Sequence, residues 1–277
     1  MLTALSARVL TSAHSDIIAD RLDSDPYATC LVGSRFLREM SSARMGGEFW
    51  GITGGRDGIF FAGSNLIPVS GDAKAMRAFA SLAMRRGRRS ASLMGRSELV
   101  TTVWEALEPK WGPARAIRWN QPVLTCVQPP AVPPDARVGR ANPHDLDLYY
   151  PAAVAMFTAE IGIDPRQGDG GRSYSAKLRD LLSRGHCFAR IEDGRVIFKA
   201  EIGAMTATTA LIQGVWVDPE WRGRGIGAAG MAAVVAAIQQ GLGKVPCLYV
   251  NDFNSAARAA YSRVGFTQVA SFTSVLF

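Results

Sequence analysis

Cysteine and histidine are scarce in this sequence of 277 residues. The four cysteines stand far apart and form no Cys-x-x-Cys pair: Cys30, Cys126, Cys187 and Cys247. The three histidines are scattered as well: His14, His144 and His186. This spacing supports no zinc site, no disulfide framework and no histidine-dependent nucleophile. We therefore expect buried free thiols and no bound metal.

Long apolar runs are also missing. The longest apolar run, residues 231–238, is far too short to cross a bilayer, so we expect no membrane segment. Residues 1–8 carry no charged stretch ahead of an apolar run, so we expect no signal peptide. The composition, 48% hydrophobic and 20% charged, is that of a globular protein of one large or two small domains.

The net charge of +7 is spread over both halves of the chain. Only Arg85-Arg86-Gly87-Arg88-Arg89 forms a basic run, and it closes a predicted helix. Cations there complement the helix dipole, so the run is either a solvated helix end or a patch for an anionic partner. No aromatic residues alternate with it, as they would in a stacking platform for nucleic acid, and we do not expect nucleic acid to bind.

The most informative segment is a glycine-rich turn between a predicted strand, 211–217, and an alanine-rich helix, 227–240. Glycines let the backbone approach an anion, and a helix N-terminus adds partial positive charge. Arg222 and Arg224 add full charges within the turn. The pattern predicts a site for a nucleotide-like diphosphate.

Several phosphate-binding motifs can be compared with this turn. Gly225-x-Gly227-x-x-Gly230 matches the dinucleotide fingerprint, and Asp252 lies about where a ribose ligand is expected. The dinucleotide fold, however, places its first glycine almost directly after the strand and needs more βα units than the remaining residues can supply. No Gly-Lys-Ser/Thr follows the turn, which excludes a nucleoside-triphosphate P-loop.

Two blocks in order carry a different resemblance. Arg222-x-x-Gly225-x-Gly227 is similar to the acyl-CoA pyrophosphate motif of the GNAT superfamily of N-acyltransferases. The block from Leu248 to Phe266 resembles the strand, Asn-capped helix, tyrosine and Gly-Phe sequence that follows this motif in the superfamily. The resemblance covers about residues 137–277.

The resemblance implies an α/β (α+β) fold with a mixed, mostly antiparallel sheet flanked by helices. The predicted elements follow that order, with Asp193-Gly194 as the hairpin turn. They are a strand at 137–140, helices at 146–161 and 174–183, a hairpin of 187–191 with 196–202, a strand at 210–217, a helix at 227–240, a strand at 246–250, a helix at 255–263 and a closing β pair to 277.

Four prolines within residues 129–134 predict a stiff connector. We therefore expect an N-terminal domain at 1–128, a linker at 129–136 and the acyl-CoA-binding domain at 137–277. The N-terminal half repeats the order faintly, with a hairpin at 48–62, helices at 72–86 and 98–107, and a strand at 90–94. Residues 65–72 stand where the arginine-rich loop should be, without its motif. The half is either a degenerate GNAT-like repeat, which we favour, or an unrelated α/β cap.

The resemblance assigns cofactor-binding roles to two stretches and one further residue. The backbone of the strand would pair with the pantetheine arm, and the Val217 N–H would polarise the thioester carbonyl. The turn would hold the pyrophosphate, and an asparagine at a helix start would both cap the helix and contact the cofactor. The residues are Val215, Trp216, Val217, Arg222, Gly223, Arg224, Gly225, Ile226, Gly227, Ala228 and Asn254.

The resemblance also suggests catalytic residues. Tyr261 matches the tyrosine that protonates the leaving sulfur, although it could equally be a tyrosine packed on the sheet. Glu201 is the first candidate for the general base, on a strand expected to border the cleft, although a solvent-facing role is also open. Gln213 stands nearer the usual catalytic glutamate and could only orient water, and Glu160 is a third possibility.

The sequence thus predicts an acyl-CoA-dependent N-acyltransferase that uses acetyl-CoA and transfers the acetyl group to a primary amine by direct attack. The acceptor would be a small-molecule amine or a protein amine. The alternative is a non-catalytic acyl-CoA sensor that regulates a partner. Because acyl-CoA is a cytosolic metabolite, we expect a cytoplasmic protein.

Overall fold

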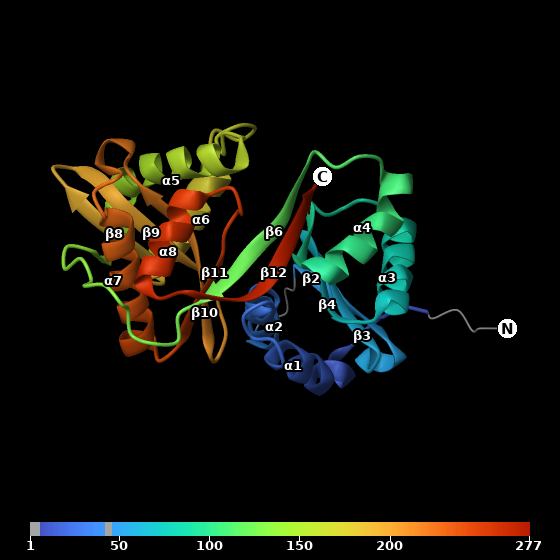
Figure 1. Cartoon of the computed structure of the whole chain (residues 1–277). Helices are drawn as coiled ribbons and strands as arrows, with labels where there is room; N and C mark the ends of the chain where they lie inside the picture. The colour runs from blue at the N-terminus through green and yellow to red at the C-terminus, as the bar shows by residue number, and fades with distance from the viewer. Residues whose placement is uncertain (1–5, 42–45) are drawn as a thin grey trace. The chain divides into compact units, whose positions relative to one another are not determined.

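The computed structural model describes residues 6–41 and 46–277 (Figure 1). The prediction that there is no signal peptide rests on residues 1–8. Of these, residues 1–5 lie outside the described range. The chain forms two compact units. Unit 1 contains Met1–Leu124, Tyr249–Phe253 and Gln268–Phe277, and unit 2 contains Thr125–Leu248 and Asn254–Thr267. None of the helices in the described part of the chain has the length and hydropathy that a membrane crossing requires.

Unit 1 is a sheet with helices packed against it. Its strands are, in their spatial order, β1 (Arg8–Val9), β2 (Gly47–Ile52), β3 (Gly58–Gly63), β4 (Asn65–Gly71), β5 (Ser92–Arg96), β12 (Thr267–Leu276) and β6 (Ala116–Thr125). Its α-helices are α1 (Ser15–Asp23), α2 (Cys30–Ser41), α3 (Ala73–Arg86) and α4 (Ser97–Trp111). Two hydrophobic clusters build the core, one containing Phe60, Phe79 and Trp104 and the other Phe49 and Phe61.

Unit 2 is built in the same way. Its strands lie in the order β11 (Val245–Tyr249), β10 (Thr209–Val217), β9 (Arg195–Met205), β8 (Cys187–Glu192) and β7 (Gly139–Arg140). Its α-helices are α5 (Leu146–Ile161), α6 (Arg172–Ser183), α7 (Ile226–Leu242) and α8 (Ser255–Val264). Asp193 and Gly194 both have positive φ, as the predicted hairpin turn between β8 and β9 requires.

The two units share one topology. In unit 1, β2, β3 and β4 are antiparallel neighbours and β4 pairs in parallel with β5. In unit 2, β8, β9 and β10 are antiparallel and β10 pairs in parallel with β11. Helix α3 joins β4 to β5 just as α7 joins β10 to β11. The repeat predicted for the N-terminal half is therefore present in the structure.

The last strand of the chain belongs to unit 1. The predicted closing β pair was wrong, because residues 267–276 form one continuous strand, β12, which lies antiparallel to β5 and beside β6 (Figure 1). A buried chain of side-chain hydrogen bonds fastens it, from Ser274 to Gln121 at 2.6 Å and from Gln121 to Asn251 at 2.9 Å. The compact units consequently differ from the predicted linear division, which left all of 137–277 in one domain.

Two proline-containing segments also differ from expectation. Helix α4 does not stop before Pro109 but continues to Trp111. The missing N–H falls in the last turn, where Trp111 packs edge-on against Phe277 at 5.3 Å. In the proline-rich segment 129–136, the Ala131 and Asp135 amides donate to Val264 and Ala229, so this segment is tied to unit 2.

All four cysteines are buried and free, as predicted. Burial raises the pKa of the Cys187 thiol to about 12, and the negative charge of Glu201 adds to the shift. A thiol that holds its proton this firmly is a poor nucleophile.

Gly230 is a packing requirement of unit 2. A Cβ at this position would lie 2.7 Å from the Phe198 ring, which is fully buried under α7. We expect Gly230→Ala to destabilise the protein by about 1–3 kcal/mol through overpacking, measured by urea unfolding. Gly241→Ala, on the exposed end of the same helix, is the matched control and should stabilise by up to about 1 kcal/mol. Equal stability of the two variants would contradict the prediction.

Candidate functional site

Strand β10 separates from β11 halfway along its length. The two strands pair in parallel only from Thr209 to Leu211, whose partner is Cys247. From Ile212 to Val217, no strand of the described residues pairs with β10 on its β11 side. Its side chains from Gln213 onward are half-buried. The backbone at this edge is consequently available to an extended ligand.

A β-bulge lies at the point of separation. Gln213 pairs with Glu201 and Trp216 pairs with Lys199, so three steps on β10 match two steps on β9. Gly214 supplies the bulge with a φ of +60°. Such a bulge bends its strand away from the regular ladder, which accounts for the separation.

The glycine-rich turn follows β10 after one short 3-10 turn, Pro219–Trp221. Gly223 and Gly225 both have left-handed backbones, with φ of +74° and +77°. Gly225 is the N-cap residue of α7, and no side chain caps this helix. Among the turn and loop hydrogen bonds of the described residues, none uses the Gly223, Arg224 or Gly225 amide as donor. The turn therefore presents uncapped amides at the N-terminus of a 17-residue helix, a geometry that suits an anion.

Ionic and aromatic contacts hold this turn in place. Asp218, which is 5% exposed, accepts from Arg195 at 2.8 Å and from the Glu220 amide. The Arg190 and Arg224 guanidinium groups lie over the Trp221 ring at 5.4 Å and 5.1 Å. The Arg222 Nε donates to the Val217 carbonyl at 3.1 Å, joining the turn to the end of β10. The turn is thus fixed before any ligand arrives.

The described residues of unit 1 show no counterpart of this turn. Strands β4 and β5 also separate after two paired residues, but a single residue, Asp72, connects β4 to α3. The Asp72 carboxylate accepts from the Ala75 amide at 2.8 Å and so caps the helix. A carboxylate at this helix N-terminus occupies the position that a phosphate would need. The N-terminal repeat therefore keeps the fold and lacks the anion site.

A buried polar cluster lies behind the bulge. The Lys199 Nζ donates to the Gly214 carbonyl at 2.8 Å and pairs with the Glu201 Oε1 at 2.7 Å. The side chains of Lys199 and Glu201 are 0% and 4% exposed. The Tyr149 ring lies 5.1 Å from Lys199, and the Gln213 amide donates to the Glu201 Oε2 at 3.2 Å. The sequence did not indicate the role of Lys199, because no local pattern links it to Gly214.

The structure places Glu201 away from solvent. Both of its carboxylate oxygens already have hydrogen-bond or ionic partners within unit 2. Burial, with the charge of Glu201 as a second cause, raises the pKa of Tyr149 far above its usual value. The geometry thus favours a role for Glu201 in holding the bulge over a role in taking a proton from an incoming amine.

Asn254 is the N-cap residue of α8, and Tyr261 lies within the same helix. The Asn254 side chain caps this helix by accepting from the Ala257 amide at 3.1 Å. Tyr261 is 6% exposed and packs against Phe266. Burial raises the pKa of Tyr261 above its usual range, and the charge of the exposed Glu160 on α5 adds to the shift. The Tyr261 phenol is therefore protonated at neutral pH.

Two family descriptions match this chain. Residues 156–266 match the Acetyltransferase (GNAT) family, and residues 47–149 match a domain of unknown function, DUF4081. The chain thus carries a domain of the GNAT acetyltransferase family. No curated protein gives a significant match to the sequence.

Solved structures resemble the chain over its whole length. A Drosophila protein has 15% identity and a TM-score of 0.68, with 99% of each chain covered. A GCN5-related N-acetyltransferase from Sphaerobacter thermophilus has 17% identity and a TM-score of 0.60, covering 100% of this chain and 96% of that one. A tandem GNAT protein from the clavulanic acid biosynthesis pathway has 13% identity and a TM-score of 0.55, with 98% of each covered. These likenesses confirm the predicted GNAT fold for both halves.

Proposed function

We propose that this protein is an acyl-CoA-dependent N-acyltransferase that transfers an acetyl group from acetyl-CoA to a primary amine by direct attack. One observation carries the proposal: the end of β10 that leaves β11 is followed, after the turn of residues 218–225, by the uncapped N-terminus of α7. An extended arm that ends in a diphosphate fits this combination of a free strand edge and an anion site.

The uncapped turn fits the pyrophosphate of acetyl-CoA. In the proposal, the backbone from Arg222 to Ala228 and the two arginine side chains hold the pyrophosphate. The backbone of Val215, Trp216 and Val217 pairs with the pantetheine arm, and Asn254 adds a contact at the start of α8. Acetyl-CoA supplies the acyl thioester.

The chemistry is divided among few residues. The Val217 N–H holds the carbonyl oxygen where negative charge develops. As the amine nitrogen bonds to the acyl carbon and the carbon–sulfur bond breaks, Tyr261 gives its proton to the sulfur. The amine loses its own proton to a base. We assign this role to Glu160, because its carboxylate is exposed and its charge raises the pKa of Tyr261. Glu201 contributes by positioning the bulge.

Titration calorimetry with acetyl-CoA tests the proposal, followed by release of the CoA thiol in the presence of a panel of amines and amine-bearing peptides. Binding at micromolar concentration together with amine-dependent thiol release supports the transferase. Binding without release from any amine would favour the alternative, a non-catalytic acyl-CoA sensor. No binding would overturn both.

The proton on Tyr261 should matter for the reaction more than for binding. We expect Tyr261→Phe to lower the rate of thiol release about 100-fold while acetyl-CoA affinity changes little, because only the proton donor is removed. Tyr174→Phe is the matched control, since burial also raises the pKa of Tyr174 and its hydroxyl donates to the Ala153 carbonyl. Equal rates for the Tyr261 variant and wild type would rule out the acid role.

A further inference from the structure

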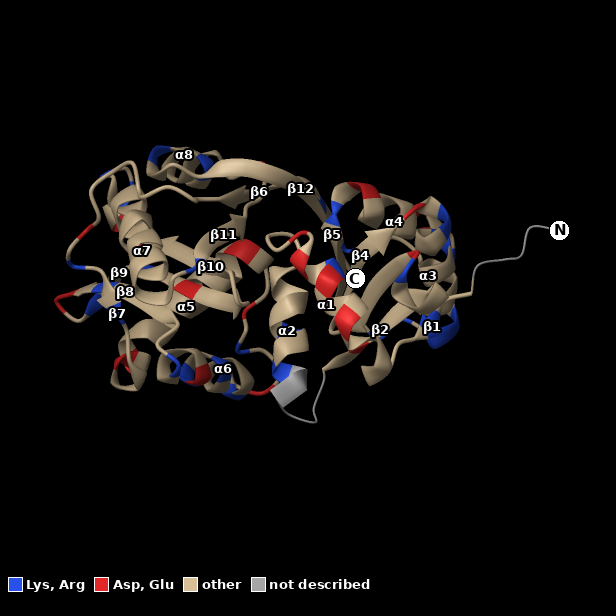
Figure 2. Ribbon diagram, turned by 90° about the horizontal axis from the view of Figure 1, so that it is seen from below, with Lys and Arg blue, Asp and Glu red and all other residues tan. Residues whose placement is uncertain are grey.

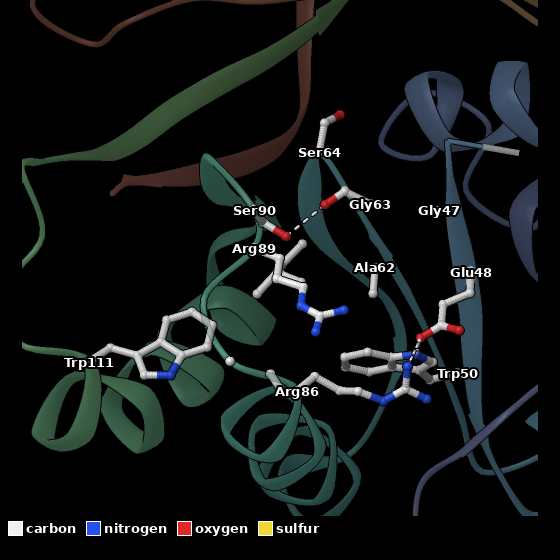
Figure 3. A pocket seen from close by; sticks show the side chains of 13 residues that line it. Gly47, Glu48, Trp50, Ala62, Gly63, Ser64, Arg86, Arg89, Ser90 and Trp111 are labelled. Carbon is white, nitrogen blue, oxygen red and sulfur yellow. Dashed lines mark hydrogen bonds and ion pairs between the residues drawn. The ribbon is translucent and has the colours of Figure 1, made fainter.

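Unit 1 contains a cavity of about 470 Å³ at the end of α3 opposite its Asp72 cap. It lies between the start of β2, the end of β3 and the C-terminal ends of α3 and α4 (Figure 3). Helix α3 has 14 residues and is therefore about 20 Å long. The cavity is consequently not a remnant of the cofactor position, which would lie at the N-terminal end of α3.

Two tryptophans line the cavity, and each packs against a phenylalanine. Trp50, which is only 2% exposed, stacks on Phe60 at 5.3 Å with the planes 8° apart and lines the inner wall of the cavity. The half-buried Trp111 packs edge-on against Phe277. Ala62, Leu66 and Ala83 complete the apolar lining. Rigid aromatic walls of this kind suit a flat ring and cost little ordering entropy on binding.

Charge in the cavity is unbalanced. Glu48 accepts from the Trp50 Nε1 at 2.8 Å and pairs with Arg86 at 3.0 Å, so these two charges cancel. Arg89 makes no hydrogen bond or ion pair with the residues that the structure describes. In Figure 3 its guanidinium points into the space between Trp111 and Trp50. One positive charge therefore faces the cavity without a counter-charge.

The local backbone explains this arrangement. Gly87, with a φ of +78°, ends α3 and turns the chain. Arg86 and Arg89, on either side of the turn, line the cavity, whereas the neighbouring Arg88 does not. Elsewhere in unit 1 the ribbon carries both basic and acidic residues, with several acidic ones on α1 (Figure 2). The basic run noted in the sequence thus divides into cavity residues and solvated residues.

We propose that this cavity binds a small ligand with a planar ring and one anionic group, a carboxylate or a phosphate monoester. Trp111 and the edge of Trp50 contact the ring, and Arg89 pairs with the anion, with the Ser64 and Ser90 hydroxyls at the rim. The cavity volume lies within the usual range for small-molecule sites, about 300–1,000 Å³. The proposal is independent of acetyl-CoA binding in unit 2.

Titration calorimetry of the full chain with two anionic probes, indole-3-acetate and AMP, tests the proposal. Their neutral analogues, indole-3-acetamide and adenosine, are titrated in parallel. We expect at least one anion to bind below 1 mM and at least 10-fold more tightly than its neutral analogue, and which anion binds shows which of the two probes the cavity accepts. Failure of both anions to bind wild type, or equal binding of the neutral analogues, would overturn the proposal.

Variants locate the binding. Arg89→Gln should weaken the bound anion at least 10-fold, and Trp111→Leu should weaken the anion and its neutral analogue alike. Arg88→Gln changes the net charge equally without touching the cavity, so it should bind like wild type. An equal loss in Arg88→Gln and Arg89→Gln would mean non-specific attraction and would overturn the site. Because both arginines are exposed, neither substitution should disturb folding.

Discussion

Gly225→Asp should lower acetyl-CoA affinity about 1,000-fold. Gly225 has a left-handed backbone, which costs a residue with a Cβ about 1–2 kcal/mol. The new carboxylate would also lie at the uncapped N-terminus of α7, where it replaces and repels the pyrophosphate at a cost of about 2–4 kcal/mol. The backbone strain lowers folding stability and not affinity. Since each 1.4 kcal/mol is tenfold, a repulsion near 4 kcal/mol by itself gives the expected loss.

Gly243→Asp is the matched control for this experiment. Gly243 is the C-cap residue of the same helix, its φ is +63°, and a Cβ there meets nothing within 4 Å. The substitution imposes the same strain and the same charge at the opposite end of α7. Calorimetry should show wild-type affinity for Gly243→Asp. If Gly225→Asp also bound acetyl-CoA like wild type, the turn would not be the pyrophosphate site.

Breaking the buried Lys199–Glu201 pair should have the largest effect on stability. Lys199→Met leaves the Glu201 carboxylate buried without its cation and frees the Gly214 carbonyl of its donor. We expect a loss of about 3–5 kcal/mol in the free energy of unfolding, measured with urea. The bulge should loosen as well, so acetyl-CoA affinity should fall in parallel.

A double-mutant cycle separates the pair from its surroundings. Lys199→Met combined with Glu201→Gln leaves no unpaired charge, so it should be more stable than the sum of the single losses predicts, by about 2 kcal/mol. Lys177→Met, at an exposed lysine on α6, should change stability by no more than about 0.5 kcal/mol. Additive losses in the cycle would show that the two side chains do not act as a pair.

Local patterns predicted most of unit 2 correctly. Helix 146–161 has the predicted bounds, and the helices predicted at 227–240 and 255–263 differ by one or two residues at their ends. These segments carry a clear periodicity and sharp end signals such as Asn254 and Gly265, which fix structure through neighbours in sequence. The glycine-rich turn could also be predicted from the sequence, because Gly223 and Gly225 shape it through their own backbone conformation.

The sequence failed where the outcome depends on distant partners. It gave no indication of α1, α2 or β6, and it treated residues 267–277 as the end of the C-terminal domain. Strand β12 instead pairs with β5, more than 170 residues away. Strand pairing depends on the edge that is available in space, so no local signal in residues 267–276 could identify β5 as the partner.

In the candidate site, too, some features follow from the local sequence and others depend on distant residues. Glu201 was chosen as a base from its place on a strand, yet only the folded sheet shows that Lys199 and Gln213 occupy its carboxylate. Whether a carboxylate takes a proton or holds a lysine depends on burial and on residues from other strands.

By itself, the sequence determined that this chain has a glycine-rich turn at the start of a helix, set in a GNAT-like order of elements. Glycine backbones, helix caps and periodicity act over a few residues and can therefore be recognised from the sequence alone. Only the tertiary structure decided that the last strand completes unit 1, that Lys199 supports the bulge and that Arg89 faces two tryptophans across a cavity. Those features join residues that are far apart in the chain, and packing alone brings them together.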